Sequence, residues 1–145
     1  MEKTLKERLQ EISQDAEGNS FQNLGEIVKK AGSVFIRPPA TGLLMMELKD
    51  TFDTGFYLGE VLVTEALAEL NGRQGYAMAI GDCPAVTGVL ACVEAVEKNG
   101  SEYKSVIDEI TKELEALEDA AEKTIKKENA FISSTRVNFE SMRKG

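Results

Sequence analysis

The sequence predicts an α+β fold in which an antiparallel meander of three or four strands packs against helices. Extended apolar runs at residues 41–50, 59–70 and 73–80 are joined by short connections, as in a meander. Segments with apolar residues at helical spacing precede and follow these runs, so helices can cover one face of the sheet. The chain has 145 residues and no Pro/Gly-rich linker. We therefore expect one domain, residues 1–145.

The N-terminal part of the sequence predicts two helices. Residues 3–15 carry apolar side chains at helical spacing and predict a short amphipathic helix; these side chains are Leu5, Leu9 and Ile12. A second helix is expected to begin at Ser20, whose hydroxyl can accept a hydrogen bond from a free N–H group of the first turn. Gly32 is expected to terminate that helix.

Glycine and proline mark the limits of the predicted strands. A β-branched and aromatic strand is expected to follow Gly32 and to stop at the Pro-Pro pair 38–39, because proline cannot donate to a strand ladder. The first two apolar runs are expected to form a hairpin across the polar loop 51–55. Asn71-Gly72 predicts a type I′ turn into the third run, since both residues adopt positive φ at low cost.

A helix is predicted over residues 84–98. Asp82 stands where an N-cap belongs, and Pro84 is tolerated in the first turn because its missing N–H group needs no partner there. Asn99-Gly100 is expected to end the helix. Its predicted inward side chains are Val86, Val89, Leu90, Val93 and Val96.

The C-terminal part predicts a long helix and then a terminal strand or arm. Residues 102–131 show a narrow apolar stripe, a pattern suited to packing on one partner helix; its members are Val106, Ile110, Leu114, Leu117, Ala121 and Ile125. Residues 134–145 lose this period and alternate apolar and polar side chains, which favours an extended arm. Such an arm is expected to dock on this chain or on another.

Composition and charge exclude several classes of protein. The formal net charge of -8 argues against nucleic acid or an anionic membrane as the partner, because both repel an acidic surface. The sequence shows neither a signal-peptide core nor a run of roughly 20 apolar residues that could span a bilayer. We therefore expect a cytoplasmic protein.

The sequence offers little catalytic chemistry. It contains no histidine, the commonest general base near neutral pH. Cys83 and Cys92 would lie about 13 Å apart along one helix, beyond disulfide reach and too few for a metal site. Glu65 and Glu69 would also lie about 13 Å apart along one strand, too far for joint acid/base work. Because no phosphate-binding glycine motif is present either, we expect no catalytic, cofactor-binding or metal-binding residue in this chain.

Three stretches of the sequence resemble one family. They are "RPPATGLLMMEL", then "FYLGEVLVTEALAEL" followed by "NGRQGYAMAIGDCPAVTGVLACVEAV", and finally "TRVNFESM". In order and spacing they are similar to the PhnG family, the G subunit of the carbon-phosphorus lyase system. The motif residues are Thr41, Gly42, Gly59, Glu60, Gly75, Tyr76, Gly81, Asp82, Arg136, Val137, Asn138, Phe139 and Met142. Asn138 and Glu140 depart from the family pattern, which has Asp and Phe at these positions.

The resemblance implies an accessory role in a bacterial complex of G, H, I and J subunits that prepares alkylphosphonates for bond cleavage. In that complex the I subunit (PhnI), helped by the G and H subunits (PhnG and PhnH), couples the phosphonate to ATP at ribose C1′ and releases adenine. The iron-sulfur chemistry belongs to the J subunit (PhnJ). ATP and the cluster are thus implied for the wider complex, and PhnI is the expected main partner.

The resemblance and the expected arm together predict a partner interface, whose candidate residues are Gly59, Gly75, Tyr76, Gly81, Asp82, Arg136, Val137, Asn138, Phe139 and Met142. One alternative is a self-associating scaffold or regulatory protein that uses its long C-terminal helix, including a homodimer of the isolated chain. A further alternative is an independent enzyme with a carboxylate or cysteine mechanism. Neither nucleic acid nor membrane is an expected partner.

Overall fold

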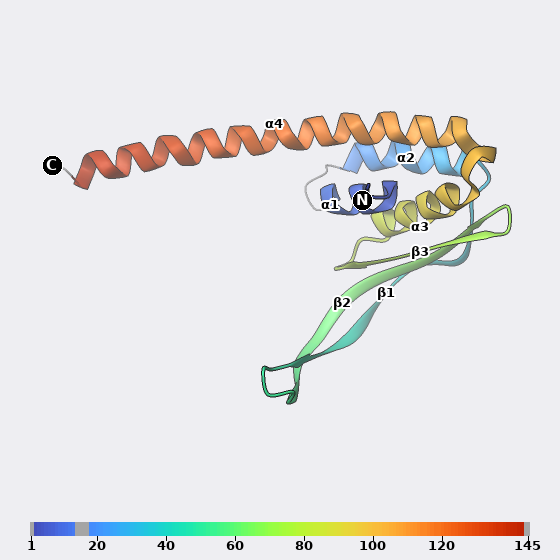
Figure 1. Cartoon of the computed structure of the whole chain (residues 1–145), viewed down its shortest axis with the longest axis horizontal. Coiled ribbons are helices and arrows are strands. Elements are labelled where there is room, and N and C mark those ends of the chain that lie inside the picture. Colours follow the sequence, from blue (N-terminus) through green and yellow to red (C-terminus); the bar gives the residue numbers. More distant parts are fainter. Residues whose placement is uncertain (1, 14–17, 144–145) are drawn as a thin grey trace.

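The computed structural model describes residues 2–13 and 18–143, with the side chains of residues 2–13 and 21–131 (Figure 1). The elements in chain order are α1 (Leu5–Ile12), α2 (Gly18–Lys30), β1 (Val34–Lys49), β2 (Gly55–Leu70), β3 (Arg73–Ile80), α3 (Pro84–Asn99), the 3₁₀ helix η1 (Gly100–Tyr103) and α4 (Lys104–Arg143). The predicted α+β class is confirmed.

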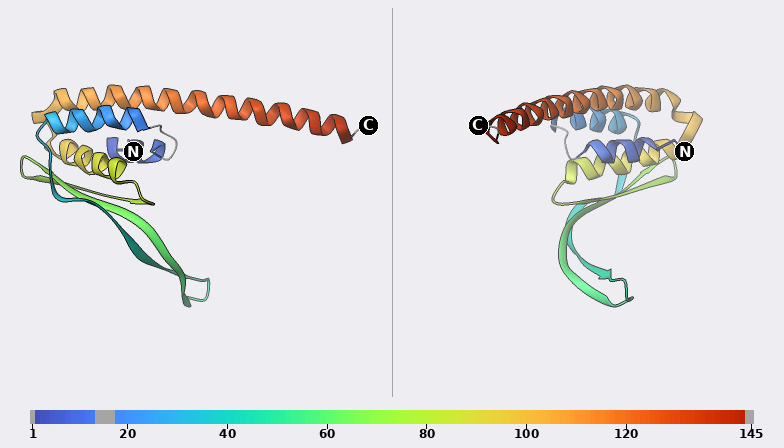
Figure 2. Two further views of the ribbon diagram at one scale, coloured as in Figure 1. Left: turned by 180° about the vertical axis from the view of Figure 1, so that it is seen from behind. Right: turned by 60° about the vertical axis from the view of Figure 1, so that its left-hand side comes forward.

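The three strands form one antiparallel sheet in the order β1-β2-β3, as the predicted meander requires. Helix α3 packs on one face of this sheet against β2 and β3, and α1 lies beside α3 (Figures 1 and 2). Helix α2 and the first half of α4 cover α3 and α1 on the side away from the sheet. The core between these layers includes the fully buried side chains of Leu9, Leu24, Leu90, Ile110 and Leu114.

Helix α3 is buried on nearly every side because it lies between the sheet and the other helices. Seven consecutive residues, 87–93, are buried, and so are Ala95 and Val96. The predicted apolar stripe therefore forms part of a wider buried surface. Alanine and glycine let the sheet approach α3 closely: a Cβ atom added to Gly75 on β3 would lie 2.0 Å from the carbonyl oxygen of Ala91.

Two of the predicted turns are confirmed by their backbone conformation. Asn71 and Gly72 have φ of 50° and 78° and join the paired residues Leu70 and Arg73, as a type I′ hairpin turn requires. Gly100, with φ of 63°, follows the last residue of α3. These glycines mark positions where a side chain is disfavoured by positive φ.

The prediction that the first strand stops at the Pro-Pro pair is wrong. Strand β1 passes through Pro38 and Pro39 to Lys49. It is an edge strand, so a missing N–H group on its outer side costs no ladder bond. Its register shifts between Arg37 and Ala40, which leaves the prolines without direct partners on β2.

The predicted N-caps of α2 and α3 are also wrong. Helix α2 begins at Gly18, so Ser20 lies inside the helix and is not its N-cap. Residues 18–20 include no proline, so the helix can extend N-terminal to Ser20. At α3 the N-cap is Cys83, because Pro84 excludes the residue before it from helical conformation. The Cys83 side chain caps none of the N–H groups of the helix. Asp82 instead accepts a hydrogen bond from the Thr41 hydroxyl at 2.8 Å.

The predicted terminal strand or arm over 134–145 is wrong for residues 134–143, which continue α4 to Arg143. The sequence contains neither glycine nor proline between Ser101 and Lys144, so nothing interrupts the helix. The alternation of apolar and polar residues in this segment did not indicate a strand. Residues 144 and 145 lie outside the described part of the chain.

Charged side chains fasten α1 to the rest of the body. The Arg8 guanidinium donates two hydrogen bonds, of 2.9 and 2.8 Å, to the Glu118 carboxylate on α4. Lys6 forms an ion pair with Glu94 on α3. Burial disfavours the charged form of Glu94, but hydrogen bonds from Lys6 and Lys98 outweigh it and lower the pKa of this carboxyl. Arg8 likewise lowers the pKa of Glu118.

Candidate partner interface

A two-stranded ribbon projects from the body of the protein. We define the ribbon as residues 43–62, the part of β1 and β2 that lies beyond the pairing of β2 with β3. It bends away from the helices, and its turn is far from α3 (Figures 1 and 2). An isolated two-stranded hairpin is only marginally stable in water, so the ribbon is the part of the described sheet with the least support from the core.

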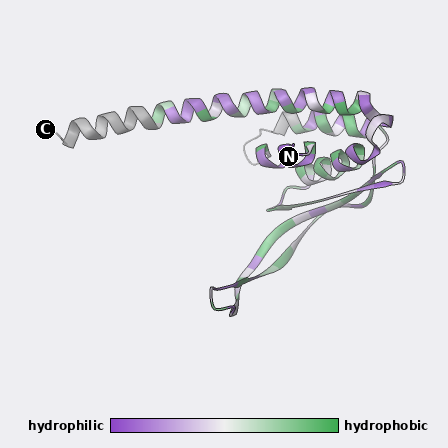
Figure 3. Ribbon diagram, in the orientation of Figure 1, coloured by the Kyte–Doolittle hydropathy of each residue, from purple (hydrophilic) through white to green (hydrophobic). Residues whose placement is uncertain are grey.

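Large apolar side chains remain exposed on both strands of the ribbon and at its turn. Figure 3 shows that hydrophobic residues recur along both strands of this hairpin. The exposed set comprises Leu43, Leu44, Met45, Leu48, Phe52, Phe56, Tyr57, Leu58 and Leu62. Successive residues of a strand point to opposite faces, so the neighbours Leu43 and Leu44 expose apolar surface on both faces of the ribbon. Large contiguous apolar patches of this kind mark interaction surfaces on soluble proteins.

The backbone of the turn at the end of the ribbon is ordered by hydrogen bonds to one carboxylate. Asp50 accepts hydrogen bonds at 2.9 Å from the backbone N–H groups of both Phe52 and Thr54. Asp53 adopts a positive φ of 60°, a conformation that Asp tolerates better than most residues. The turn thereby presents Phe52 to solvent with 86% of its surface exposed. An exposed aromatic side chain on an ordered turn is suited to enter a partner's pocket.

A second projecting surface is the distal part of α4. We define the α4 extension as residues 122–143, which continue the helix past the end of α1 and α2 (Figure 1). The last buried residue of α4 is Leu117 among those described, and residues 122–131 are all exposed. Ile125 and Phe131 expose 50% and 74% of their surfaces.

The face of the sheet opposite α3 carries a small polar cluster around Tyr76. The Tyr76 hydroxyl donates to the Glu65 carboxylate at 2.8 Å, and Arg37 lies 4.0 Å from the same carboxylate. The hydrogen bond to Glu65 raises the pKa of Tyr76. These side chains are exposed, so Tyr76, a predicted interface residue, is available to a partner.

The corner between β3 and α3 is tied to the sheet by a buried hydroxyl. Thr64 is fully buried; it donates to the Gly81 carbonyl oxygen at 2.6 Å and accepts from the Cys83 N–H group at 3.1 Å. Gly81 has φ of 100° and lies next to the exposed Asp82. Gly81 therefore shapes the corner through its backbone conformation, and Asp82 ties it to β1 through the hydrogen bond from Thr41. Asp82 is also accessible to a partner.

The other two predicted interface glycines occupy different environments. Gly59 lies in the ribbon, with φ of 125° and open space where a Cβ would be. Gly59 is the cross-strand partner of Met46, and the register shifts before the next pair, Glu47 and Tyr57, so Gly59 serves a β-bulge. Gly75 is buried under α3, where the lack of a side chain permits close packing.

The predicted terminal motif lies on the α4 extension. The backbone there is helical. The side chains of the motif lie outside the described residues; they are Arg136, Val137, Asn138, Phe139 and Met142.

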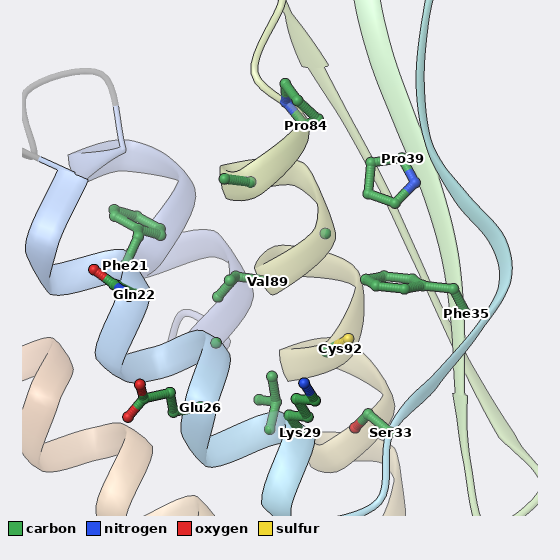
Figure 4. A pocket seen from close by; sticks show the side chains of 14 residues that line it. Phe21, Gln22, Glu26, Lys29, Ser33, Phe35, Pro39, Pro84, Val89 and Cys92 are labelled. Atoms are coloured by element: carbon green, nitrogen blue, oxygen red, sulfur yellow. The ribbon is translucent and has the colours of Figure 1, made fainter.

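An apolar groove of about 880 Å³ lies between α2, α3 and β1 (Figure 4). Phe21 enters it from α2, Phe35 and Pro39 border it from β1, and Cys92 lies at its wall on α3. Burial raises the pKa of the Cys92 thiol to about 11, against an opposing effect of the Ser33 hydroxyl. A neutral thiol is a poor nucleophile. The groove can hold an apolar group, but Cys92 is not suited to catalysis there.

Among the described residues, no three Cys, Asp or Glu side chains gather as a metal site would require. Nor does any described helix have the length and apolar character needed to cross a membrane. The features that stand out are the two projecting surfaces, which are suited to contact with another macromolecule.

A family model described as phosphonate metabolism protein PhnG matches residues 6–145. The chain belongs to the PhnG family. This match covers nearly the whole chain, including the N-terminal helices and the α4 extension. No curated protein matches the chain significantly. Membership in the PhnG family makes this chain a subunit in phosphonate metabolism and implies that it works with partners, as the resemblance predicted.

For this PhnG family member, sequence reasoning did not identify the ribbon as an exposed surface. A signal was present in "LLMM" at residues 43–46, where four consecutive apolar side chains must place two on each face of a strand. A single helical layer can cover only one of those faces. The pattern therefore pointed either to a sheet buried on both faces or to an exposed apolar strand.

Proposed function

We propose that this chain is an accessory, non-catalytic subunit of the carbon-phosphorus lyase core complex, which acts as α-D-ribose 1-methylphosphonate 5-triphosphate synthase. It supports the ATP-dependent activation of alkylphosphonates by docking on the I subunit. The H and J subunits are its further partners in the complex. The chain itself holds no cofactor, and ATP and the iron-sulfur cluster belong to other subunits.

The observation that carries this proposal is the apolar ribbon. Nine large apolar side chains are exposed over residues 43–62, on a segment with little support from the core. Burying such side chains is worth about 1.5–3 kcal/mol each in transfer free energy, before the costs of association. A subunit of a stable complex has a reason to keep this surface, whereas an isolated protein would be prone to aggregate.

The α4 extension supplies the second proposed contact. Its terminal motif, residues 136–142, is expected to meet the partner as a helix and not as an extended arm. Tyr76 and Asp82 are exposed on the body of the protein and complete the proposed interface. Gly59 contributes by bending the ribbon, and Gly75 and Gly81 contribute by shaping the sheet that carries it.

Co-purification tests the proposal. The full chain and the I subunit, mixed at equal concentration, are expected to elute together in size-exclusion chromatography. The full chain alone, incubated with ATP and methylphosphonate, is expected to release no adenine. Separate elution of the two proteins, or adenine release by the chain alone, would overturn the proposal. Deleting residues 134–145 is expected to weaken the complex, and unchanged assembly would remove the α4 extension from the interface.

Self-association through α4 is the second candidate function, favoured by the exposed residues 122–131. Two such helices could pair along Ile125 and Phe131. Light scattering of the full chain separates the candidates. A stable homo-oligomer that does not dissociate when the I subunit is added favours the scaffold, and a chain whose aggregation the I subunit prevents favours the accessory subunit.

A further inference from the structure

Part of strand β2 has an unoccupied edge. Strand β1 pairs with β2 from Gly55 to Glu69, but β3 pairs with it only from Val63 to Leu70. The last contact of β2 on the β3 side is the hydrogen bond from the Gly81 N–H group to the Leu62 carbonyl oxygen, 2.7 Å long. On that side, residues 55–61 have no neighbouring strand among the residues described.

The direction of the backbone groups along this edge follows from that last hydrogen bond. In an antiparallel strand the N–H and C=O groups of one residue point to the same side, and alternate residues point to opposite sides. Because the Leu62 carbonyl points toward β3, the N–H and C=O groups of Glu60 point to the unoccupied edge. Those of Val61 point toward β1, where Val61 is paired with Leu44.

Apart from the β-bulge at Gly59, the edge carries few of the features by which sheet proteins prevent unwanted pairing. Exposed edges usually carry lysine or proline, or are covered by a loop. Residues 55–61 read "GFYLGEV" and contain neither lysine nor proline, and Glu60 is their one charged residue. The side chains flanking the edge include Phe56, Tyr57 and Leu58, all exposed. An added strand would bury these side chains while its main chain paired with the edge.

The charge of the ribbon indicates the chemistry of the strand that fits. Residues 43–62 carry four carboxylates, at Glu47, Asp50, Asp53 and Glu60, and one ammonium group, at Lys49. Lys49 is paired with Asp53 at 3.3 Å, so its charge is already balanced within the turn. The ribbon thus carries a net negative charge around its exposed apolar surface. A second copy of the same acidic ribbon would be repelled, and a basic strand would be attracted.

We propose that another subunit adds a β-strand to β2 along residues 55–61, as in other cases of strand addition. That strand is extended, alternates apolar side chains, and is flanked by lysine or arginine. It turns the two-stranded ribbon into a three-stranded sheet and continues the position of β3 beyond Gly81. This inference rests on the proposed function, because it specifies how the docking partner is held.

A proline substitution tests strand addition against docking through side chains alone. E60P removes the N–H donor at the unoccupied edge, and E60A removes the same carboxylate but keeps the donor. Proline is tolerated where the N–H group of an edge strand faces solvent, so both full-length variants are expected to fold. Titration of each variant with the I subunit, by calorimetry, gives the ratio of their affinities.

The expected result is that E60P binds the I subunit about tenfold more weakly than E60A, the effect of one lost backbone hydrogen bond and the shift it imposes. Equal affinities would overturn strand addition but leave the proposed function standing. A wild-type chain that binds no I subunit would overturn both.

Hydrogen exchange of the wild-type chain gives a second test that does not depend on E60P folding. Amides in residues 55–61 are expected to exchange at least about tenfold more slowly once the I subunit is bound. Unchanged exchange would contradict the proposal. Slower exchange that instead appears on raising the concentration of the chain alone would assign the edge to a second copy, and would also contradict it.

Discussion

Leu43 and Leu62 are direct cross-strand partners in the ribbon, yet they remain 65% and 42% exposed. A pair of leucines in this arrangement normally lies under a helix or another sheet. Replacing both by serine removes apolar surface without changing the core, so the double variant L43S/L62S is expected to aggregate less than the wild type. Its free energy of unfolding should change by less than about 1 kcal/mol.

Light scattering and urea unfolding of the isolated chain check this prediction. Val34→Ser is the matched control, because Val34 is an apolar residue of β1 that is 60% exposed but lies outside the ribbon, opposite Glu69. Equal aggregation of L43S/L62S and the wild type would mean that the ribbon is not the adhesive surface of the isolated chain.

Gly75 supports the packing of β3 on α3. In Gly75→Ala the new methyl group would lie 2.0 Å from the Ala91 carbonyl oxygen and 2.5 Å from the Ala95 nitrogen. The helix and the sheet must separate to accept it, which is expected to lower the free energy of unfolding by about 1–3 kcal/mol. Gly42→Ala is the control, because a Cβ there meets nothing within 4 Å. A stability of Gly75→Ala equal to that of the control would refute close packing at this site.

The ion pair between Arg8 and Glu118 makes stability depend on pH. Arg8 lowers the pKa of Glu118 below its ordinary value of 4.5, so this carboxylate stabilises the folded chain above pH 4.5. The contribution is lost as the pH falls through the lowered pKa. Glu118→Gln should therefore lose less stability than the wild type between about pH 6 and about pH 3.

Urea unfolding at several pH values measures this difference. Glu109→Gln, at an exposed position on the same helix, controls for the removal of one negative charge. If Glu118→Gln and the wild type lose stability in parallel, the pair does not contribute to the acid dependence.

The two cysteines are expected to differ in reactivity. Cys92 is buried and the pKa of its thiol is raised to about 11, whereas Cys83 is partly exposed at the start of α3. A thiol reagent such as DTNB at about pH 8 should label Cys83 rapidly and Cys92 only on unfolding. Cys83→Ser should remove the rapid phase and Cys92→Ser should preserve it. Rapid labelling of Cys83→Ser would contradict the burial of Cys92.

The sequence allowed the elements set by local chemistry to be predicted. Asn71 and Gly72 specify their turn through backbone conformation alone, and Gly100 ends α3 for the same reason. Helix α3 was predictable because its apolar residues are dense and Pro84 marks its start. These features depend on a few neighbouring residues, so single-sequence reasoning reaches them.

Features that depend on distant parts of the chain were not predictable in the same way. Pro38 and Pro39 are compatible with β1 only because β1 lies at the edge of the sheet, which no local pattern shows. Asp82 was a plausible cap, but Thr41, far along the chain, binds its carboxylate. The exposure of the ribbon was also hidden, because apolar residues on both faces of a strand indicate burial as readily as an unoccupied interface.

Calorimetric titration tests most directly whether the ribbon is the docking surface of an accessory subunit. The I subunit is titrated with L43S/L62S, with Val34→Ser and with the wild type. We expect L43S/L62S to bind more than about tenfold more weakly than the wild type, because the contacts that two leucines would make with the partner are lost. Val34→Ser is expected to bind like the wild type. Equal affinity of all three proteins would show that the ribbon is not the docking surface.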